Sequence, residues 1–370
     1  MFRAALLSLV IGALLVGACT STPTTTPTPA PADTPAAPAD TPAASEAPSG
    51  GRLAAINARG KLICGVNGSL PGFSFLEQGT GAWSGFDVDF CRAVAAAVFG
   101  DPDAVEYRAL SADDRGPALQ TGEIDVLIRN TTWTVTRDAQ WGQFAPTTFY
   151  DGQGIMVRAE VGATSLEDLD GATVCVQSGT TTELNLADAM ANAGLEGKYT
   201  ASVFSEIDET YSTYESGACD AVTSDRSQLV SRRSSMANPA DHVLLDTVMS
   251  KEPLGPVTPL KDDEWFNVVK WTVFAIFEAE EQEITQANVT EIRDTSENPV
   301  IKRLLGTDPD GQQGTLLGLE NGWVVDVISA VGNYGEIFER NVGPDTVLGL
   351  DRGLNQIWTN GGLLYSPPYR

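Results

Sequence analysis

The alternation of apolar and polar residues divides the chain after about residue 60 into short strands and helices. The run 61–66 is apolar enough to form a short buried strand. Phe86, Phe90, Val94 and Val98 recur every four residues, which predicts a helix with one buried face that ends near Gly100. Further strands are expected at 105–107 and 124–128, separated by a helix that opens at Ser111–Asp114, where the spacing is that of a capping box, and stops at Gly122.

A second series of elements repeats this pattern. Strands are predicted at 173–176, 199–204, 221–223 and 243–245, with intervening helices that end near 192, cover 207–215, and run from Asp225 to about 235. A strongly apolar helix is expected at 265–277, and shorter helices at 323–331 and around 337–338. Strands that alternate with helices in this way predict an α/β fold with parallel sheets.

Two such series in one chain predict two α/β lobes with a cleft between them. The chain crosses between the lobes near 152–157 and again near 247–257, a stretch rich in Pro and Gly. The first lobe is therefore expected to comprise residues 52–153 and the returning segment 251–370, and the second lobe residues 154–250. Small molecules bind at such lobe interfaces and at the carboxyl ends of parallel strands, so a ligand site is expected in the cleft.

The N-terminus has the pattern of an export signal. A basic residue, Arg3, precedes an apolar run at 4–16 that is too short for a comfortable membrane span. The sequence Leu-Val-Gly-Ala-Cys at 15–19 resembles a bacterial lipobox, which predicts a signal peptide at 1–18 and lipidation of Cys19. An ordinary secretory signal with an unrelated cysteine is the alternative.

Composition separates a tether from the folded part. Residues 19–51 are nearly all Thr, Pro, Ala and Ser after the cysteine, a composition that favours an extended chain and not a packed core. The whole chain carries a formal charge of −26. Such an acidic protein repels nucleic acid, so no nucleic-acid partner is expected.

The remaining cysteines fit an exported protein. Cys64, Cys91, Cys175 and Cys219 are an even number without a C-x-x-C pair, which favours disulfides over a zinc site. Three pairings are possible from the sequence alone. We favour Cys64–Cys91 and Cys175–Cys219 because each pair then stays within one predicted lobe, with buried reduced thiols as the alternative.

Signals for catalysis are weak. The sequence has one histidine, His242, in a predicted loop where we expect it at the surface, and no G-x-S-x-G motif. No glycine-rich run has the spacing of a dinucleotide or phosphate loop. We therefore expect no enzyme, no cofactor and no metal site.

Several long motifs occur in the order found in family 3 solute-binding proteins. These are GFDVD at 85–89, ALQTGEID at 118–125, TWTVTR at 132–137 and QSGT at 177–180. More narrowly, the chain resembles general L-amino-acid-binding proteins of the Aap/Bzt type, in the runs WSGFDVDFC at 83–91, RNTTWT at 129–134, CVQSGTTTELNL at 175–186 and GNYGEIFER at 332–340. The resemblance covers essentially all of 52–370 and implies a periplasmic-binding-protein fold that closes on one amino acid.

The resemblance also implies how the ligand is held. An amino acid brings a carboxylate and an ammonium, which suit a guanidinium fork and a buried carboxylate. By position, Arg137 corresponds to the residue that grips the α-carboxylate, and Asp225 to the acid that pairs with the α-ammonium. The remaining expected contacts are the hydroxyl and amide of Thr132, the backbone carbonyl of Asn130, and Thr180 and Thr181 at a helix N-terminus, a suitable anion site.

The pocket for the ligand side chain is expected to be mixed in character. Asn67, Leu70, Phe73 and Gln177 match positions that frame the ligand in relatives, which implies broad specificity with a bias to polar side chains. Arg115 and Arg129 enter this pocket or form structural ion pairs, and the sequence leaves both open. Asp87 and Asp89 are expected to be acids of a first helical turn, not ligand contacts.

The resemblance implies a function and its partners. The chain is expected to be a monomer anchored outside the cytoplasm by its lipid, capturing L-amino acids and passing them to the permease subunits of an ABC importer. The anchor and tether depart from the relatives, which are usually soluble in the periplasm. The alternatives are a cyclohexadienyl dehydratase-like enzyme on the same fold and an amino-acid sensor module.

Overall fold

The computed structural model of the chain describes residues 51–370. The predicted signal peptide, Cys19 and the tether up to residue 50 lie outside the described residues. No helix within 51–370 combines the length and the apolar character needed to cross a bilayer. Within the same range, no group of three or more His, Cys, Asp or Glu side chains is placed to hold a metal ion.

A five-stranded sheet forms the centre of the first lobe. In order across the sheet, its strands are β5 (Val105–Ala109), β1 (Leu62–Val66), β6 (Val126–Leu127), β14 (Val257–Pro259) and β7 (Gly142–Phe144). β1 is parallel to both β5 and β6, as predicted, and β14 is antiparallel to both of its neighbours. The side chains of Leu62, Cys64 and Val66 are buried, which explains why the apolar run forms a central strand.

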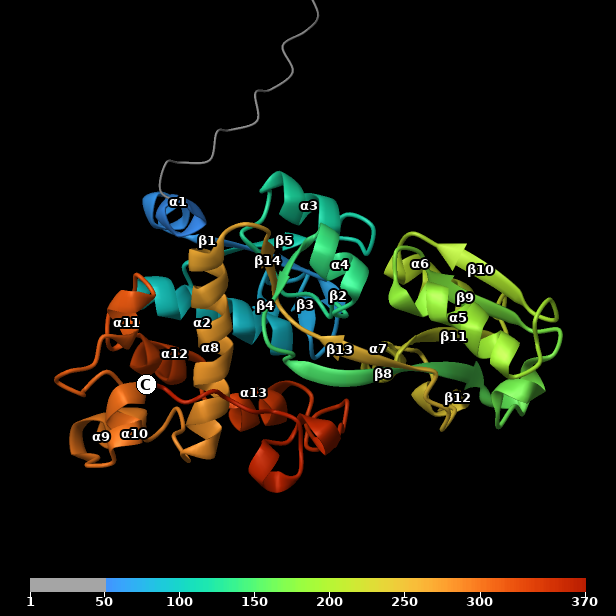
Figure 1. The fold of residues 1–370 in the computed structure, drawn as a ribbon. Coiled ribbons are helices and arrows are strands. Elements are labelled where there is room, and N and C mark those ends of the chain that lie inside the picture. The colour runs from blue at the N-terminus through green and yellow to red at the C-terminus, as the bar shows by residue number, and fades with distance from the viewer. Residues whose placement is uncertain (1–50) are drawn as a thin grey trace, which may run out of the picture. The chain divides into compact units, whose positions relative to one another are not determined.

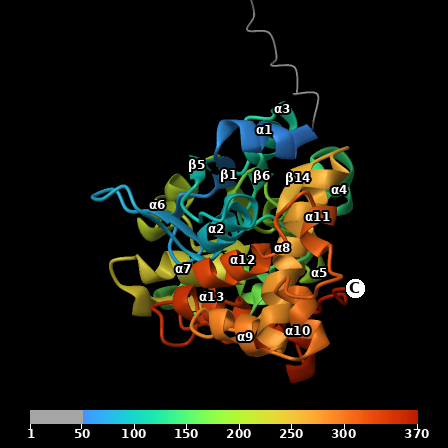
Figure 2. The ribbon, with the colours of Figure 1, turned by 90° about the vertical axis from the view of Figure 1, so that its left-hand side faces the viewer.

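Four helices share one hydrophobic core with this sheet: α2 (Phe86–Phe99), α8 (Asp263–Glu281), α12 (Trp323–Val331) and α13 (Tyr334–Asn341). The four-residue spacing predicted α2, and Phe86, Phe90 and Val94 are buried in it. α12 occupies the predicted range 323–331. Figure 2 shows these helices gathered on one side of the lobe. The C-terminal segment thus belongs to the core of the first lobe and fixes α2 against α8.

A second sheet forms the centre of the other lobe. Its order is β10 (Thr200–Phe204), β9 (Thr173–Gln177), β11 (Ala221–Asp225), β8 (Phe149–Arg158) and β12 (His242–Leu244), with β13 (Ser250–Leu254) also paired to β8. β9 is parallel to β10 and β11, and β8 is antiparallel to its partners. The helices of this lobe are α5 (Thr181–Asn192), α6 (Ile207–Glu215) and α7 (Arg226–Ser234). The predicted helix 207–215 is confirmed at both ends.

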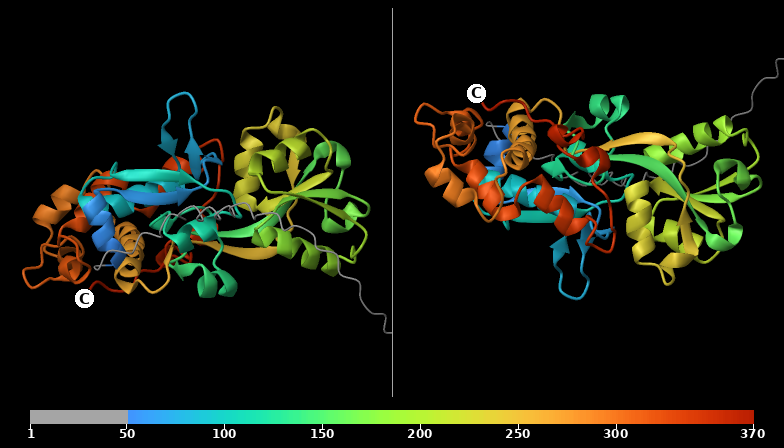
Figure 3. Two further views of the ribbon diagram at one scale, coloured as in Figure 1. Left: turned by 90° about the horizontal axis from the view of Figure 1, so that it is seen from above. Right: turned by 90° about the horizontal axis from the view of Figure 1, so that it is seen from below.

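The two lobes are connected by β8 and β13, which are paired with each other. Their antiparallel register runs from Phe149 opposite Leu254 to Gln153 opposite Ser250. In Figure 1 both strands pass from the first lobe to the second, and the views from above and below in Figure 3 show the same arrangement. The predicted crossover regions thus form one two-stranded ribbon.

The remaining elements lie outside the two main sheets. They are α1 (Gly51–Arg59), a small antiparallel sheet of β2 (Ser69–Leu70), β3 (Ser74–Leu76) and β4 (Trp83–Ser84), the helices α3 (Arg115–Thr121), α4 (Val135–Gln140), α9 (Val289–Thr295), α10 (Pro299–Leu304) and α11 (Gln313–Leu316), and 3-10 turns at Ala159–Val161, Leu166–Leu169, Pro239–Asp241, Gly353–Asn355 and Trp358–Asn360.

Both favoured disulfides are present. Cys64 of β1 is bonded to Cys91 of α2, which fixes a helix to the central strand of the first lobe. Cys175 of β9 is bonded to Cys219 just before β11, which fixes the turn between α6 and β11 to β9 in the second lobe. Neither bond crosses between the lobes, so neither restrains their relative motion.

Two local expectations are wrong. His242 is not at the surface: it begins β12, is 7% exposed, and its Nδ1 lies 2.9 Å from the hydroxyl of Tyr214. Burial lowers the pKa of His242 below its usual value, so the ring serves as a neutral hydrogen-bonding group of the lobe. Ser111 and Asp114 do not form a capping box on α3. The hydroxyl of Ser111 donates to the carboxylate of Asp114 at 2.7 Å and accepts the N–H of Asp114 at 3.2 Å, which closes the turn that precedes the helix.

Candidate ligand-binding site

The cleft lies where the carboxyl ends of β6 and β11 face each other. Asn130 follows β6, Asp225 ends β11, and the amide of Asn130 donates to Gln228 of the opposite lobe at 3.0 Å. The cavity between the lobes has a volume of only about 10 Å³. It is lined by Arg115, Arg129, Asn130, Thr132, Gln177, Thr180, Thr181, Thr182, Ser224, Asp225 and Gln228. The cleft is thus nearly closed, and entry of a ligand requires the lobes to part.

Arg137 lies beside the cavity on α4 and reaches across to the second lobe. Thr134 caps α4 by accepting the N–H of Arg137, which fixes where the side chain starts. The guanidinium donates to the carbonyl of Thr132 at 3.1 Å and to that of Gly179, in the other lobe, at 3.2 Å. Burial lowers the pKa of Arg137, although the carboxylates of Asp225 and Glu252 act to raise it. Within 51–370 no carboxylate forms an ion pair with Arg137.

Two more buried arginines, Arg115 and Arg129, line the cavity itself. Arg115 donates weakly, at 3.4 Å, to Thr131 and to the carbonyl of Gly179, and its Nε has no partner in the described part of the chain. Arg129 donates through Nε to the carbonyl of Leu110 at 2.9 Å. Burial lowers the pKa of Arg129 to about 10 and that of Arg115 well below its usual value. Neither arginine forms an ion pair with a described carboxylate. Of the two alternatives that the sequence left open for them, structural ion pairs are therefore not observed.

Asp225 supplies the negative charge in the cavity. It occupies the N-cap position of α7, but its carboxylate does not cap the helix and accepts no hydrogen bond from any residue in 51–370. It is only 5% exposed. Burial raises the pKa of Asp225 well above its usual value, helped by the nearby carboxylates of Asp151 and Glu252. A buried carboxylate without a hydrogen-bond donor is costly, and a cationic donor group of a ligand would remove that cost.

Asn130 is held in an unusual backbone conformation at the edge of the cavity. Its φ of 23° lies in the left-handed region, which Asn tolerates better than most residues. Its N–H donates to the carboxylate of Asp87 at 3.0 Å, while its side-chain oxygen is buried without a partner. Asp87 thus belongs to the first turn of α2, as predicted. Its carboxylate also holds the backbone of Asn130 in place at the edge of the cavity.

The start of α5 forms the opposite wall. Thr180 is the N-cap, and its hydroxyl accepts the N–H of Glu183 at 3.0 Å. Thr181 and Thr182 follow in the first turn, where backbone N–H groups lack partners within the helix. Gln177 ends β9 just before this turn and donates to the carbonyl of Ser205 at 2.9 Å. The wall therefore combines hydroxyls, an amide and a helix N-terminus.

Glu252 is a buried member of the site that the sequence analysis missed. It lies on β13 and accepts hydrogen bonds from the hydroxyls of Thr132 and Thr181, at 2.6 Å and 2.7 Å. Gln228 was also missed, although it follows Asp225 by less than one helical turn. An acidic residue inside a Pro- and Gly-rich connector is the only signal that could have drawn attention to Glu252.

Four of the predicted residues do not line the cavity. Leu70 and Phe73 are buried in the core of the first lobe, where Phe73 packs edge-on against Phe149 at 5.2 Å between ring centroids. Asn67 shapes a turn by accepting the N–H of Ser69 at 3.1 Å, and its Nδ2 is buried without a partner among the described residues. Arg137 lies just outside the lining, as described above.

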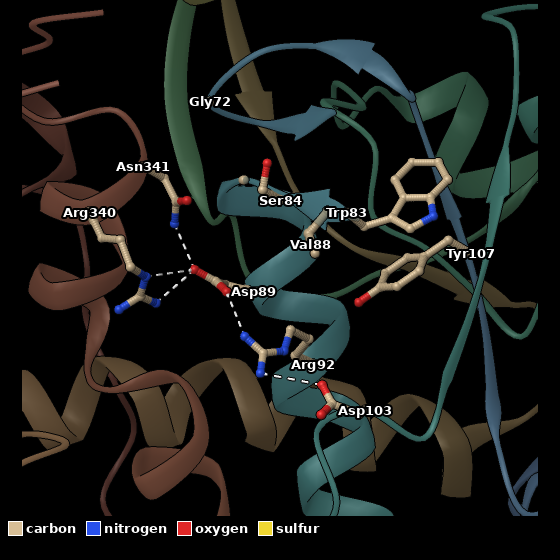
Figure 4. Close-up of a pocket in the computed structure, with 11 residues that line it drawn as sticks. Gly72, Trp83, Ser84, Val88, Asp89, Arg92, Asp103, Tyr107, Arg340 and Asn341 are labelled. Atoms are coloured by element: carbon tan, nitrogen blue, oxygen red, sulfur yellow. Dashed lines mark hydrogen bonds and ion pairs between the residues drawn. The ribbon is translucent and has the colours of Figure 1, made fainter. Parts of the chain in front are cut away.

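A larger hollow, of about 610 Å³, opens on the first lobe between β4, α2 and α13 (Figure 4). Trp83 and Tyr107 stack along one side with ring centroids 5.1 Å apart. Its charged side chains neutralise one another: Asp89 accepts from Arg340 at 2.7 Å and from Asn341 at 2.6 Å, and Arg92 lies 3.7 Å from Asp89 and 3.4 Å from Asp103. This hollow offers a ligand no unpaired charge, in contrast to the cleft.

Comparison with known proteins agrees with this architecture. The chain is 51% identical over 327 residues to the general L-amino acid-binding periplasmic protein AapJ of Rhizobium johnstonii, covering 88% of this chain and 95% of that protein. It is 47% identical over 325 residues to the glutamate/glutamine/aspartate/asparagine-binding protein BztA of Rhodobacter capsulatus, with the same coverage. A periplasmic binding protein of an ABC transporter from Brucella ovis, solved with glutathione bound, superimposes with a TM-score of 0.83 at 51% identity over 86% of this chain and 99% of that one. Residues 62–361 match the model of the bacterial extracellular solute-binding proteins, family 3, and the chain belongs to that family.

Proposed function

We propose that this protein captures free L-amino acids in the cleft between its lobes and delivers them to the permease subunits of an ABC importer. The observation that carries the proposal is the unpaired state of the buried charges. Asp225 from the second lobe and Arg137 from the first lack ionic partners within the described residues, and leaving such charges unpaired is costly. A zwitterionic ligand supplies both missing partners at once.

The roles of the site residues follow from this pairing. Arg137, the N–H of Thr132 and the first turn of α5 suit the α-carboxylate, because all are donors and Arg137 reaches Gly179, just before that turn. Asp225 and the backbone carbonyl of Asn130 are acceptors and suit the α-ammonium. Because these groups come from both lobes, a bound amino acid favours the closed form.

The side-chain pocket favours polar ligands with a carboxylate or an amide. Arg115 and Arg129 add two buried cations beyond the one needed for the α-carboxylate, and Gln177 and Gln228 add amides. An acidic ligand side chain therefore offsets more of the free-energy cost of desolvating these groups than an apolar one does. We infer broad specificity in which acidic and amide side chains rank first, in keeping with the ligands that name BztA.

The location of the protein is part of the same proposal. The family is extracellular, and the lipobox at 15–19 supports anchoring through Cys19, with residues 19–51 as the tether. A single cleft made by one chain supports function as a monomer. The proposed lobe boundaries remain 52–153 with 251–370 for the first lobe and 154–250 for the second.

The proposal is tested by thermal unfolding of the purified protein with a panel of L-amino acids, D-enantiomers, glutathione and prephenate. A ligand that binds only the folded state raises the melting temperature. Several L-amino acids are expected to do so, and Arg137→Ala is expected to abolish the rise. Arg92→Ala, in the hollow of Figure 4, is the matched control and should respond like the wild type. No response to any amino acid, or turnover of prephenate, would contradict the proposal.

A further inference from the structure

Glu252 collects hydrogen bonds from three separate parts of the chain. It is 1% exposed and lies on β13, within the ribbon that joins the lobes. One carboxylate oxygen, Oε2, accepts both Thr132 Oγ1 at 2.6 Å and Thr181 Oγ1 at 2.7 Å. The other, Oε1, accepts Asn185 Nδ2 at 2.9 Å and the hydroxyl of Ser250. All four partners can donate, which suits a carboxylate that only accepts.

The two threonines belong to opposite lobes. Thr132 follows β6 of the first sheet and bridges to Leu254 of the ribbon, whereas Thr181 is the first residue of α5 in the second lobe. Their hydroxyl oxygens are 3.3 Å apart. If the lobes part, these oxygens separate, and one carboxylate oxygen can no longer accept both hydroxyls within hydrogen-bonding distance. The paired contact at Oε2 is therefore specific to the closed form.

We propose that Glu252 is a positioning residue that latches the closed cleft by holding Thr132 and Thr181 on a single carboxylate oxygen. The inference rests on the proposed function, because both threonines are assigned to the ligand site there. It adds that the hydroxyl and the backbone N–H of each threonine have different roles. With both hydroxyl protons directed at Glu252, the donors left for a ligand carboxylate are the backbone N–H groups, and that of Thr132 has no acceptor within 51–370.

The test compares Glu252→Gln with the wild type in two measurements. Glutamine keeps the size of the side chain but replaces one acceptor by an NH₂ donor, so the four donors cannot all be satisfied. Calorimetric titration with L-glutamate and L-glutamine should show affinity about tenfold weaker or more, the equivalent of losing roughly one hydrogen bond to a charged group. Small-angle X-ray scattering without ligand should show a larger radius of gyration for the variant, and saturating ligand should reduce this difference.

Glu278→Gln is the matched control. Glu278 is a buried acid of α8 in the first lobe that accepts from Gln282 at 3.0 Å and touches neither threonine. Its replacement makes the same chemical change away from the cleft and should leave both measurements unchanged.

A double-mutant cycle keeps the inference falsifiable if the variant is also less stable. Thr181→Val removes one of the two hydroxyls, and the combination with Glu252→Gln should weaken binding no more than Glu252→Gln alone, because both changes break the same contact. Additive losses, or wild-type affinity and scattering for Glu252→Gln, would overturn the latch. Failure of the wild type to bind any amino acid would instead overturn the proposed function, and the ligand-free scattering would still decide on the latch.

Discussion

Arg115 and Arg137 of the first lobe donate to the same atom of the second, the carbonyl oxygen of Gly179, over 3.4 Å and 3.2 Å. Two guanidinium groups thus converge on a single neutral acceptor. A carboxylate is a stronger acceptor than a carbonyl for such donors. The turn before α5 therefore marks the place where the carboxylate of a ligand is best accommodated.

Replacement of Arg137 by Lys tests whether the planar fork is needed at this place. Lysine keeps the charge but presents it as a point, so it cannot reach Thr132, Gly179 and a ligand carboxylate in the same geometry. We expect affinity for every amino acid to fall, by about 2 kcal/mol or more. Titration calorimetry measures the loss, and Arg340→Lys in the hollow of Figure 4 is the control. Unchanged affinity would show that Arg137 serves only to hold Thr132.

Replacement of Arg129 by Met tests the ranking of ligands. Methionine is similar in length and removes a buried cation that lines the cavity. We expect affinity for L-glutamate to fall more than affinity for L-glutamine, and affinity for L-leucine to fall least or to rise. Competition titrations with these three ligands give the ratios. Equal losses for all three would place Arg129 in the scaffold and not in the side-chain pocket.

Asp225→Asn is expected to separate stability from function. The carboxylate is buried without a hydrogen-bond donor among the described residues, so the neutral amide removes a desolvation cost and should raise the melting temperature of the ligand-free protein above pH 7. The same change removes the partner of the α-ammonium and should abolish the stabilisation by amino acids. Melting curves with and without ligand report both effects. A variant that melts lower and still binds would contradict the assignment.

The pKa of Asp87 predicts a pH dependence of stability. Burial raises it from 3.8 to about 6, against the lowering effects of the N–H of Asn130 and of Arg129. Between these two values the folded protein binds a proton more tightly than the unfolded chain, so this group adds stability as the pH falls through about 6 and removes it as the pH rises.

Asp87→Asn should remove that contribution. The difference in unfolding free energy between the variant and the wild type should therefore change between pH 4.5 and 7.5, in favour of the variant at the higher pH. Urea unfolding at a series of pH values measures it. Parallel curves for the two proteins would mean that Asp87 titrates alike in both states.

The local pattern of the sequence was sufficient for most elements around the cleft. The helices at 207–215 and 323–331 were predicted with their bounds, because apolar spacing within one element fixes which face is buried. The grouping of Asn130, Thr132, Gln177, Thr180, Thr181 and Asp225 at one cavity agrees with the resemblance.

What the sequence could not predict depends on contacts between distant segments. Phe73 has the same local pattern whether it faces a ligand or Phe149, and only the packing of α2 against the ribbon decides this. Asn238 and Pro239 before His242 favour a loop, but His242 pairs with Arg158 of β8 as a strand residue and its ring is buried against Tyr214. Glu252 becomes recognisable only when Thr132, Thr181 and Asn185 are brought together around it.

The pairing of β8 with β13 gives the joint between the lobes a preferred direction of bending. Bending within the plane of the ribbon would stretch one strand relative to the other, which fixed bond lengths resist, whereas bending across that plane needs only small changes in dihedral angles. The paired strands therefore favour an opening and closing movement of the lobes over a sliding movement. Residues that face each other across the cleft therefore meet again in the same register after every release of a ligand.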